Sequence, residues 1–333
     1  MIIVTGGAGF IGSNIVKALN RRGNEDILIV DQASNHSNLN NLFDLRVSDY
    51  IDYTDFHRNL LSRSFTNDVQ AILHQGACSD TMAVDANKIM STNFCFSKDL
   101  LNSCIDFEVP LIYASSAAIY GAGDSFSVNP RDEAPLNIYA YSKYLFDRLV
   151  RTKIQGKNSQ IVGLRYFNVY GPRETHKGMM SSIIYQMFNQ IRTGGNISLF
   201  QGTGRFGDGE QRRDFIYIDD IVNVNLHMLD NRDISGIVNV GTGRSRSFND
   251  AAMAVINAMR NLENKQTLSL EEAQNTGLIR YKPMPVELVG KYQSYTEADI
   301  STLSHSRFTQ EMMKLEDGVN AYVDECGVCN GNG

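Results

Sequence analysis

A glycine-rich segment near the N-terminus constrains the fold of this chain more than any other feature. Residues 6–12 read Gly-Gly-Ala-Gly-Phe-Ile-Gly and lie between an apolar run, Ile2–Thr5, and an amphipathic stretch, residues 13–22. This G-x-G-x-x-G spacing permits a tight turn after a strand and lets the backbone approach a pyrophosphate at a helix N-terminus. Asp31 ends the next apolar run, about 20 residues further on, where an acid accepts hydrogen bonds from an adenosine ribose. An ordinary glycine turn does not account for this context, so we predict a dinucleotide site.

Short apolar runs alternate with helical stretches through the first half of the chain. The runs are rich in Ile, Val and Leu, and their unbroken apolar character predicts strands of a parallel sheet that is covered on both faces. The expected fold class is α/β, a Rossmann-type doubly wound parallel sheet with a smaller mixed α/β C-terminal substrate domain. The expected strands are Ile2–Thr5, Ile27–Asp31, Ala71–His74, residues 111–115 and Ile161–Tyr166, with helices at residues 13–22 and 93–107.

The alternation of apolar runs with helical stretches becomes irregular after Gly171 and Pro172. We predict a dinucleotide-binding Rossmann domain at residues 1–167 and a substrate-binding domain at residues 168–325, with some chain crossing back to the first domain. A disordered tail is expected at residues 326–333. The expected elements of the second domain are helices at 179–193, 219–229 and 248–260, a strand at 236–241, a glycine-rich ligand-closing loop at 194–209 and a polar surface insertion at 261–275.

The composition excludes several functional classes. The chain is 42% hydrophobic and 20% charged, and its net charge of −6 gives no electrostatic reason to bind nucleic acid or an anionic membrane. No apolar run approaches the roughly 20 residues that span a bilayer, and the first residues lack the basic region of a signal peptide. Five cysteines fit no disulfide framework in a chain of this length, so we expect a reducing, cytoplasmic setting with buried thiols. The expected buried thiols are Cys78, Cys95 and Cys104.

Two of the cysteines, Cys326 and Cys329, form a C-x-x-C pair in the polar tail. Such a pair can be half of a zinc site or a redox pair. Because no second pair accompanies it, we predict a disordered end and no metal site.

A Tyr-x-x-x-Lys pattern, Tyr139 and Lys143, begins a helical stretch after Pro135. Residues four apart share one helix face, and an ammonium beside a phenol lowers the pKa of that phenol. Tyr139 is therefore a candidate acid or base, and Ser116, on the turn after residues 111–115, is a candidate to bond the same substrate oxygen. The alternative is a surface lysine near a packed tyrosine. The ordered set of glycine loop, Asp31, Ser116, Tyr139 and Lys143 makes redox chemistry the better interpretation.

This set resembles the extended short-chain dehydrogenase/reductase superfamily, whose members mostly act on nucleotide-sugars. The resemblance covers nearly the whole chain and includes residues 74–77 (His-Gln-Gly-Ala), residues 115–121 and residues 165–172. It implies a nicotinamide cofactor. The cofactor contacts that it implies are Gly6, Gly9, Phe10, Ile11, Gly12, Asp31, Gln32, Asn38, Gln75, Gly76, Ala77, Cys78, Ser79, Asn93, Lys143, Val169 and Lys177.

Three features of the sequence indicate which member family of the superfamily the chain resembles. Dehydratases of the superfamily carry an Asp-Glu pair where this chain has Ala117 and Ala118, so elimination of water lacks its acid and base. Residues 173–178 and residues 283–296 are similar to the ADP-glyceromanno-heptose 6-epimerase family. That similarity implies reversible oxidation at C6 of an ADP-heptose for lipopolysaccharide core synthesis. It also implies homo-oligomers, pentamers in that family.

The same resemblance assigns residue roles. Tyr139 and Lys177 would be the two proton-handling groups, and Lys143 would hold the nicotinamide ribose. A solvated surface lysine is the alternative for Lys177. Arg213 also has a physical reason, because a guanidinium fork suits a diphosphate, although paired arginines can equally form a solvated face. The implied substrate contacts are Asn168, Met179, Gln186, Phe200, Gln201, Gly202, Thr203, Arg213 and Tyr292.

The chain departs from the family at several positions. Asn38 and Tyr53 stand where NADP-binding members have lysines, and Asp31 suits a free 2′-hydroxyl. We predict NADP from the resemblance, and NAD stays open. Met179 and Gln186 replace a serine and a histidine, and residues 204–211 resemble an insertion. Two alternatives therefore remain, another nucleotide-sugar epimerase such as a UDP-hexose 4-epimerase, and a non-enzymatic dinucleotide sensor.

Overall fold

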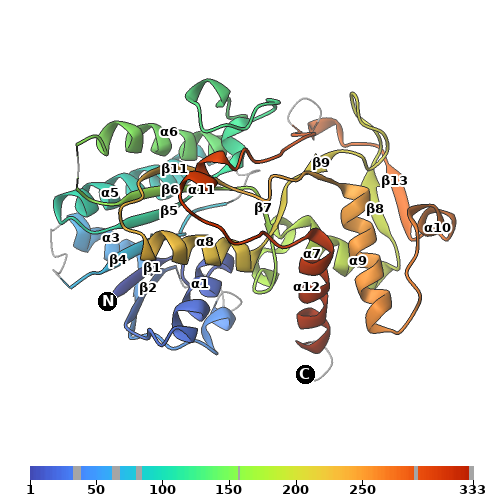
Figure 1. The fold of residues 1–333 in the computed structure, drawn as a ribbon, viewed down its shortest axis with the longest axis horizontal. Coiled ribbons are helices and arrows are strands. Elements are labelled where there is room, and N and C mark those ends of the chain that lie inside the picture. The colour runs from blue at the N-terminus through green and yellow to red at the C-terminus, as the bar shows by residue number, and fades with distance from the viewer. Residues whose placement is uncertain (33–38, 62–67, 80–84, 157, 289–291, 330–333) are drawn as a thin grey trace. The chain divides into compact units, whose positions relative to one another are not determined.

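The computed structural model describes residues 1–32, 39–61, 68–79, 85–156, 158–288 and 292–329 (Figure 1). The chain forms two compact units, which are described separately. The first unit contains residues 1–166, 221–240 and 300–309. The second unit contains residues 167–220, 241–299 and 310–333.

A seven-stranded, fully parallel sheet forms the centre of the first unit. Its strand order is β3-β2-β1-β4-β5-β6-β11, so the chain reverses its direction of travel across the sheet between β1 and β4. Ligands of such sheets bind outside the carboxyl ends of the strands at this switch point. The predicted fold class is confirmed. The strands are β1 Ile2–Thr5, β2 Ile27–Asp31, β3 Asp49–Asp52, β4 Ala71–His74, β5 Leu111–Ser116, β6 Ile161–Tyr166 and β11 Gly236–Val240.

Helices lie on both faces of this sheet (Figure 1). Helices α1 and α8 lie on one face, where Arg22 and Asp230 form an ion pair with an N–O distance of 2.9 Å. Helices α3, α5 and α6 pack together on the other face, over a buried core that includes Ile72 and Leu100. The helices are α1 Phe10–Arg21, α3 Tyr53–Leu61, α4 Ala86–Ile89, a π-helical stretch Met90–Cys95, α5 Phe96–Asp106, α6 Ile138–Lys153, α8 Ile218–Asp230, α11 Ser301–His305 and 3-10 segments Asn40–Leu42, Ala117–Tyr120 and Pro130–Asp132.

The second unit combines short strand pairs with three packed helices, α7, α9 and α12. Strands β7 and β10 pair in parallel, as do β8 and β13, whereas β9 and β12 are antiparallel. Its elements are β7 Asn168–Tyr170, a 3-10 segment Thr175–Met180, α7 Ile183–Gly194, β8 Ile197–Phe200, β9 Arg212–Arg213, β10 Phe215–Tyr217, β12 Arg246–Ser247, α9 Phe248–Leu262, α10 Leu270–Asn275, β13 Ile279–Lys282, a 3-10 segment Val286–Leu288 and α12 Leu315–Cys329.

The structure adds local detail to three expectations. The helix expected from residue 179 begins at Ile183, because Gly178 has a positive φ of 53° and Ser182 caps the helix from an extended conformation. The insertion at residues 261–275 contains α10, which a reciprocal capping box of Ser269 and Glu272 stabilises. Helix α12 continues to Cys329, so residues 326–329 of the expected tail are helical.

Cys104 is buried as expected, but Cys78 and Cys95 are only half-buried. None of the helices in the described ranges is long and apolar enough to cross a bilayer. Across the same residues, no three His, Cys, Asp or Glu side chains cluster as metal ligands would.

Candidate active site

The glycine loop after β1 lies against the segment that follows β4. Gly6 has a positive φ of 66°, and a Cβ atom there would lie 2.6 Å from the backbone nitrogen of Gly76. A Cβ atom on Gly12 would lie 2.1 Å from the carbonyl oxygen of Gly6. Both positions therefore require glycine. Helix α1 begins directly after Gly9, and Phe10 packs into the core while Ile11 is half-buried. This cradle fits a dinucleotide pyrophosphate, which needs backbone N–H groups at a helix N-terminus.

The carboxylate of Asp31, at the end of β2, is bonded to this loop. One oxygen accepts the Ala8 N–H at 2.8 Å, and the other accepts the N–H of the exposed Gln32 at 2.7 Å. Burial raises the pKa of Asp31, and these backbone donors act in the opposite direction. The carboxylate thus borders the cradle where a ribose is expected. Asn38 lies outside the described residues.

A buried amide holds the segment after β4. Asn93 bonds Cys78 twice, accepting its N–H at 2.8 Å and donating to its carbonyl at 2.9 Å, and it also donates to the Ser142 hydroxyl of α6. His74, whose pKa burial lowers to about 3, bridges the hydroxyls of Thr5 and Ser97 at 2.6 and 2.8 Å. Hydrogen bonds therefore fix the segment after β4 at His74 and at Cys78. Of the predicted contacts here, Gln75, Gly76, Ala77 and Cys78 are half-buried and Ser79 is exposed.

Ser116, Tyr139 and Lys143 come together in the first unit. Ser116 ends β5, and a hydrogen bond joins its side chain to the phenol of Tyr139. Asn137 caps α6 by accepting the Ala140 N–H, which places Tyr139 in the first turn. Lys143 lies one turn later on the same face and is almost completely buried. The three side chains thus share one end of β5 and one face of α6.

Burial sets the electrostatics of this trio. It raises the pKa of Tyr139, and the hydrogen bond with Ser116 partly offsets that effect. Burial lowers the pKa of Lys143 to about 8, against the influence of the Asp147 carboxylate. A phenol paired with a hydroxyl and a nearby ammonium can exchange a proton with a substrate hydroxyl.

Three predicted substrate contacts meet in the second unit. The guanidinium of Arg213, only 7% exposed, lies 5.0 Å from the ring centroid of Tyr292 and 5.5 Å from that of Phe248. Phe200 contacts the Tyr292 ring edge-on, with centroids 5.9 Å apart. Burial lowers the pKa of Arg213, and a hydrogen bond with Tyr292 acts in the opposite direction. A guanidinium held in an aromatic frame suits a diphosphate.

The glycine-rich loop beside this cluster folds back on itself. The Gly202 N–H donates to Asp208 at 2.7 Å, and the Gln211 amide donates to the Gln201 carbonyl at 2.9 Å. Thr203 forms a bridge with Phe206. The insertion at residues 204–211 is therefore bonded directly to the predicted contacts. Two further predicted contacts lie on β7: Asn168 is exposed and accepts a hydrogen bond from the Thr296 hydroxyl, and Val169 is half-buried.

Lys177 lies in the 3-10 segment before α7 and is half-buried. Burial lowers its pKa, and the Glu174 carboxylate acts in the opposite direction. Glu174 itself is fully buried and accepts the hydroxyls of Ser182 at 2.7 Å and Tyr322 at 3.0 Å. The backbone before Lys177 is thus anchored to α7 and α12.

The structure does not bring Met179 and Gln186 into the Arg213 cluster. The Met179 side chain is 91% exposed, and the Gln186 amide donates to the carbonyls of Met179 and Ser181 at 3.1 and 3.0 Å. Both residues line a groove of about 470 Å³ along α7, whose described lining includes neither Arg213 nor Tyr292.

Comparison with known proteins places this geometry in a family. The model of the NAD dependent epimerase/dehydratase family matches residues 2–241, more than half of the chain. The chain belongs to this family. The resemblance inferred from the sequence is confirmed.

Individual members of the epimerase/dehydratase family are similar over almost the full length. An ADP-L-glycero-D-manno-heptose-6-epimerase of Thiobacillus denitrificans is 47% identical over 322 residues, covering 97% of each chain. The crystal structure of the Helicobacter pylori enzyme of the same name has a TM-score of 0.80 at 27% identity, covering 98% of this chain and 96% of that one. The UDP-glucose 4-epimerase of Thermotoga maritima, solved with UDP-glucose, has a TM-score of 0.76 at 25% identity, covering 98% and 99%.

Sequence reasoning missed two buried acids, one close to each of the predicted catalytic lysines. Asp147 follows Lys143 by four residues, a spacing that places both on one face of α6. Glu174 precedes Lys177 by three residues in the segment that carried the resemblance. The helical spacing was a usable signal for Asp147, whereas the partners of Glu174 are distant in the sequence.

Proposed function

We propose that this chain interconverts ADP-D-glycero-D-manno-heptose and ADP-L-glycero-D-manno-heptose by epimerisation at C6, for lipopolysaccharide core synthesis. The observation that carries the proposal is the Ser116–Tyr139 hydrogen bond, with Lys143 one turn away on α6. The 47% identity to the Thiobacillus denitrificans enzyme supports the choice of substrate. Ala117 and Ala118 offer no acid or base for elimination, which favours epimerisation over dehydration.

Each residue of the site has a separate role in the proposed reaction. The glycine loop and Asp31 would hold a nicotinamide dinucleotide, which would supply the hydride acceptor and donor for oxidation and re-reduction at C6. Tyr139 takes the proton of the C6 hydroxyl, and Ser116 donates a hydrogen bond to the same oxygen. Lys143, as an ammonium, stabilises the phenolate of Tyr139 and holds the nicotinamide ribose. Because re-reduction occurs from the other face, a second proton-handling group is needed, and Lys177 takes that role.

The second unit supplies the substrate contacts in this proposal. Arg213 binds the diphosphate through its guanidinium, within the frame of Tyr292 and Phe200. The further proposed contacts are Asn168, Met179, Gln186, Gln201, Gly202 and Thr203. In the same proposal, residues 1–167 bind the cofactor, residues 168–325 bind the nucleotide-sugar, and the protein is a cytoplasmic homo-oligomer.

The proposed cofactor is NADP, with NAD as the alternative that the Asp31 carboxylate favours. Because these epimerases recycle their cofactor, we expect it to stay bound through purification. Denaturing the protein and weighing the released small molecule tests the choice, since the two dinucleotides differ by one phosphate. A mass equal to that of NAD would replace NADP in the proposal, and release of neither would contradict a retained cofactor.

The epimerase proposal predicts that the purified protein converts either C6 epimer of the ADP-heptose into a mixture of both without added cofactor. Proton NMR of the sugar follows the conversion. UDP-glucose and UDP-galactose serve as the comparison substrates, and we expect neither to react. Conversion of a UDP-hexose but not of the ADP-heptose would favour a UDP-hexose 4-epimerase. No conversion of any sugar, with either dinucleotide supplied, would contradict both.

A further inference from the structure

We propose that Asp147 is a positioning residue that holds the strand carrying Ser116 against the helix carrying Tyr139 and Lys143. The inference rests on the proposed function and adds a residue that the proposed chemistry does not use. The side-chain hydrogen bonds of Asp147 go to Tyr113, Ser115 and Arg165, and none of these residues carries a proposed chemical role. Its effect on catalysis is exerted through Lys143 and through β5.

Asp147 and Lys143 together clamp three consecutive residues of β5. The Tyr113 hydroxyl donates to Asp147 Oδ1 at 2.9 Å, and the Ser115 hydroxyl donates to Oδ2 at 2.9 Å. Between them, Lys143 Nζ donates to the Ala114 carbonyl at 2.8 Å. The clamped residues directly precede Ser116. These bonds therefore hold the end of β5, where Ser116 lies, against the helix that carries Tyr139.

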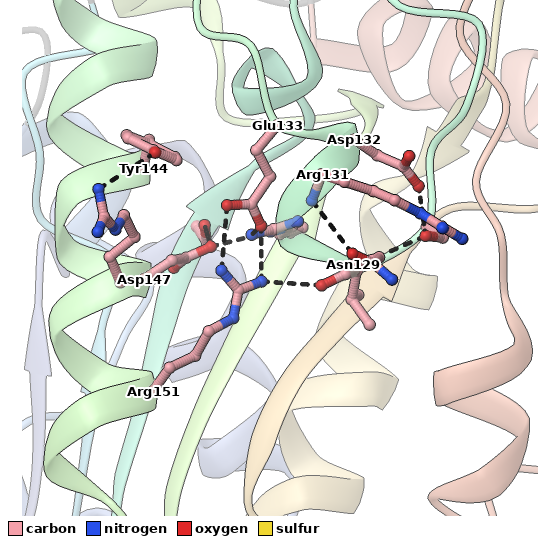
Figure 2. Close-up of polar contacts among 12 residues, drawn as sticks. Asn129, Arg131, Asp132, Glu133, Tyr144, Asp147 and Arg151 are labelled. Atoms are coloured by element: carbon pink, nitrogen blue, oxygen red, sulfur yellow. Dashed lines mark hydrogen bonds and ion pairs between the residues drawn. The ribbon is translucent and has the colours of Figure 1, made fainter.

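A ladder of ion pairs surrounds Asp147. Asp147 and Arg165 are both 0% exposed, and Arg165 Nε of β6 donates to Asp147 Oδ2 at 2.8 Å. Arg165 also pairs with Glu133, which in turn binds both terminal nitrogens of Arg151 at 2.6 and 3.0 Å. Figure 2 shows Glu133 and Arg151 facing each other beside α6, with Asp147 one turn from Arg151. The ladder thus pairs two carboxyl groups with two guanidiniums, and each buried member has a hydrogen-bonded partner.

The ladder also ties a third segment to α6. Arg151 donates to the carbonyl of Val128, and Asp132 accepts the hydroxyls of Ser125 and Ser127 in the same loop. Residues Lys143, Asp147 and Arg151 follow at intervals of four, so one helix face presents cation, anion and cation in turn. Lys143 is the member that faces the proposed chemistry.

Besides bonding β5, Asp147 acts on Lys143 through its charge. Burial lowers the pKa of Lys143 to about 8, and Asp147 limits that fall. His74 of β4 also interacts with Lys143, but burial keeps His74 neutral near pH 7. Tyr113 of β5 and Arg165 of β6 face Asp147 from the sheet. Because Lys143 works as an ammonium, activity is lost as pH rises through its pKa. Removing the charge of Asp147 lowers that pKa, so the loss moves to lower pH.

The test compares Asp147→Asn with Glu133→Gln in the holoenzyme. For Asp147→Asn we expect kcat to fall by about 10- to 100-fold, since misplacement of a reacting group by 1 Å costs about that much. We also expect the alkaline limb of the kcat–pH profile to move down by about one pH unit. Glu133→Gln disturbs the same ladder but leaves the three bonds to β5. For this variant the alkaline limb of the kcat–pH profile should not move, and kcat should change by less than about 3-fold.

A second readout separates this inference from the proposed function. Trace acetylation of Lys143, read by mass spectrometry as a function of pH, needs no sugar turnover. If the wild type fails to epimerise any sugar but the labelling midpoint falls in Asp147→Asn, the positioning role stands and the epimerase proposal falls. If the wild type epimerises the sugar, and Asp147→Asn moves neither the alkaline limb of the kcat–pH profile nor the midpoint of Lys143 labelling, the positioning role is overturned.

A gentler variant covers the case in which Asp147→Asn does not fold. Tyr113→Phe combined with Ser115→Ala removes both hydroxyl donors and keeps the carboxylate charge. We expect kcat to fall by about 10-fold while the alkaline limb stays in place, because only the clamp is loosened. An unchanged kcat in this folded double variant would overturn the proposal.

Discussion

Tyr139→Phe should lower kcat for C6 epimerisation by about 10²- to 10⁴-fold, because general acid–base transfer contributes that much to an enzymatic rate. The variant removes one oxygen and keeps the ring in place on α6. It also removes the partner of the Ser116 side chain. Stability and cofactor retention should be close to those of the wild type, since Ser116 keeps its hydrogen bond from the Ala118 N–H at 3.1 Å. Initial rates by NMR at saturating ADP-heptose measure the effect.

Tyr141→Phe is the matched control. Tyr141 lies two residues further along α6, on a different face, and its side chain is exposed. We expect its rate to stay within about 2-fold of the wild type, as for a surface change. Wild-type turnover in Tyr139→Phe would remove the tyrosine from the chemistry. A wild-type protein that retained the dinucleotide but turned over no sugar would favour the sensor alternative.

The parts of the fold that local sequence determines were predictable. Five of the six sheet strands in the first half were expected from apolar runs, and their alternation with amphipathic helices predicts a parallel sheet. Strand β3 was missed because Asp49 and Asp52 bound it and it pairs at the sheet edge, where burial does not demand an apolar run. The start of α7 was missed because Gly178 and Ser182 outweigh the apolar periodicity around them.

The candidate site divides in the same way. The glycine loop and the Tyr-x-x-x-Lys helix are local patterns with a physical cause, so the sequence alone indicated them. Partners that only the fold brings together were not predictable. Arg165 lies 18 residues from Asp147 and 32 from Glu133, and no spacing rule joins the three. Met179 and Gln186 entered the prediction by resemblance, and the structure places them in the groove along α7.

Arg165→Met should cost about 3–5 kcal/mol in the free energy of unfolding at pH 7, the usual result of removing one partner from a buried ion pair. The change leaves Asp147 buried with only hydroxyl donors and leaves Glu133 with Arg151 alone. Urea unfolding followed by circular dichroism measures the loss. Arg22→Met is the matched control, because Arg22 and Asp230 form an exposed pair that contributes at most about 1 kcal/mol.

The pH dependence of this loss separates charge from packing. Burial alone would raise the pKa of Glu133, but the hydrogen bonds and charges of Arg151 and Arg165 lower it below its ordinary value of 4.5. A carboxyl group with a lowered pKa stabilises the fold above its unfolded pKa and loses that contribution as pH falls through the folded pKa. The gap between wild type and Arg165→Met should therefore be widest near neutral pH and should narrow below about pH 4.5. A gap that stays constant over that range would mean that Arg165 stabilises the sheet through the packing of its side chain and not through its charge.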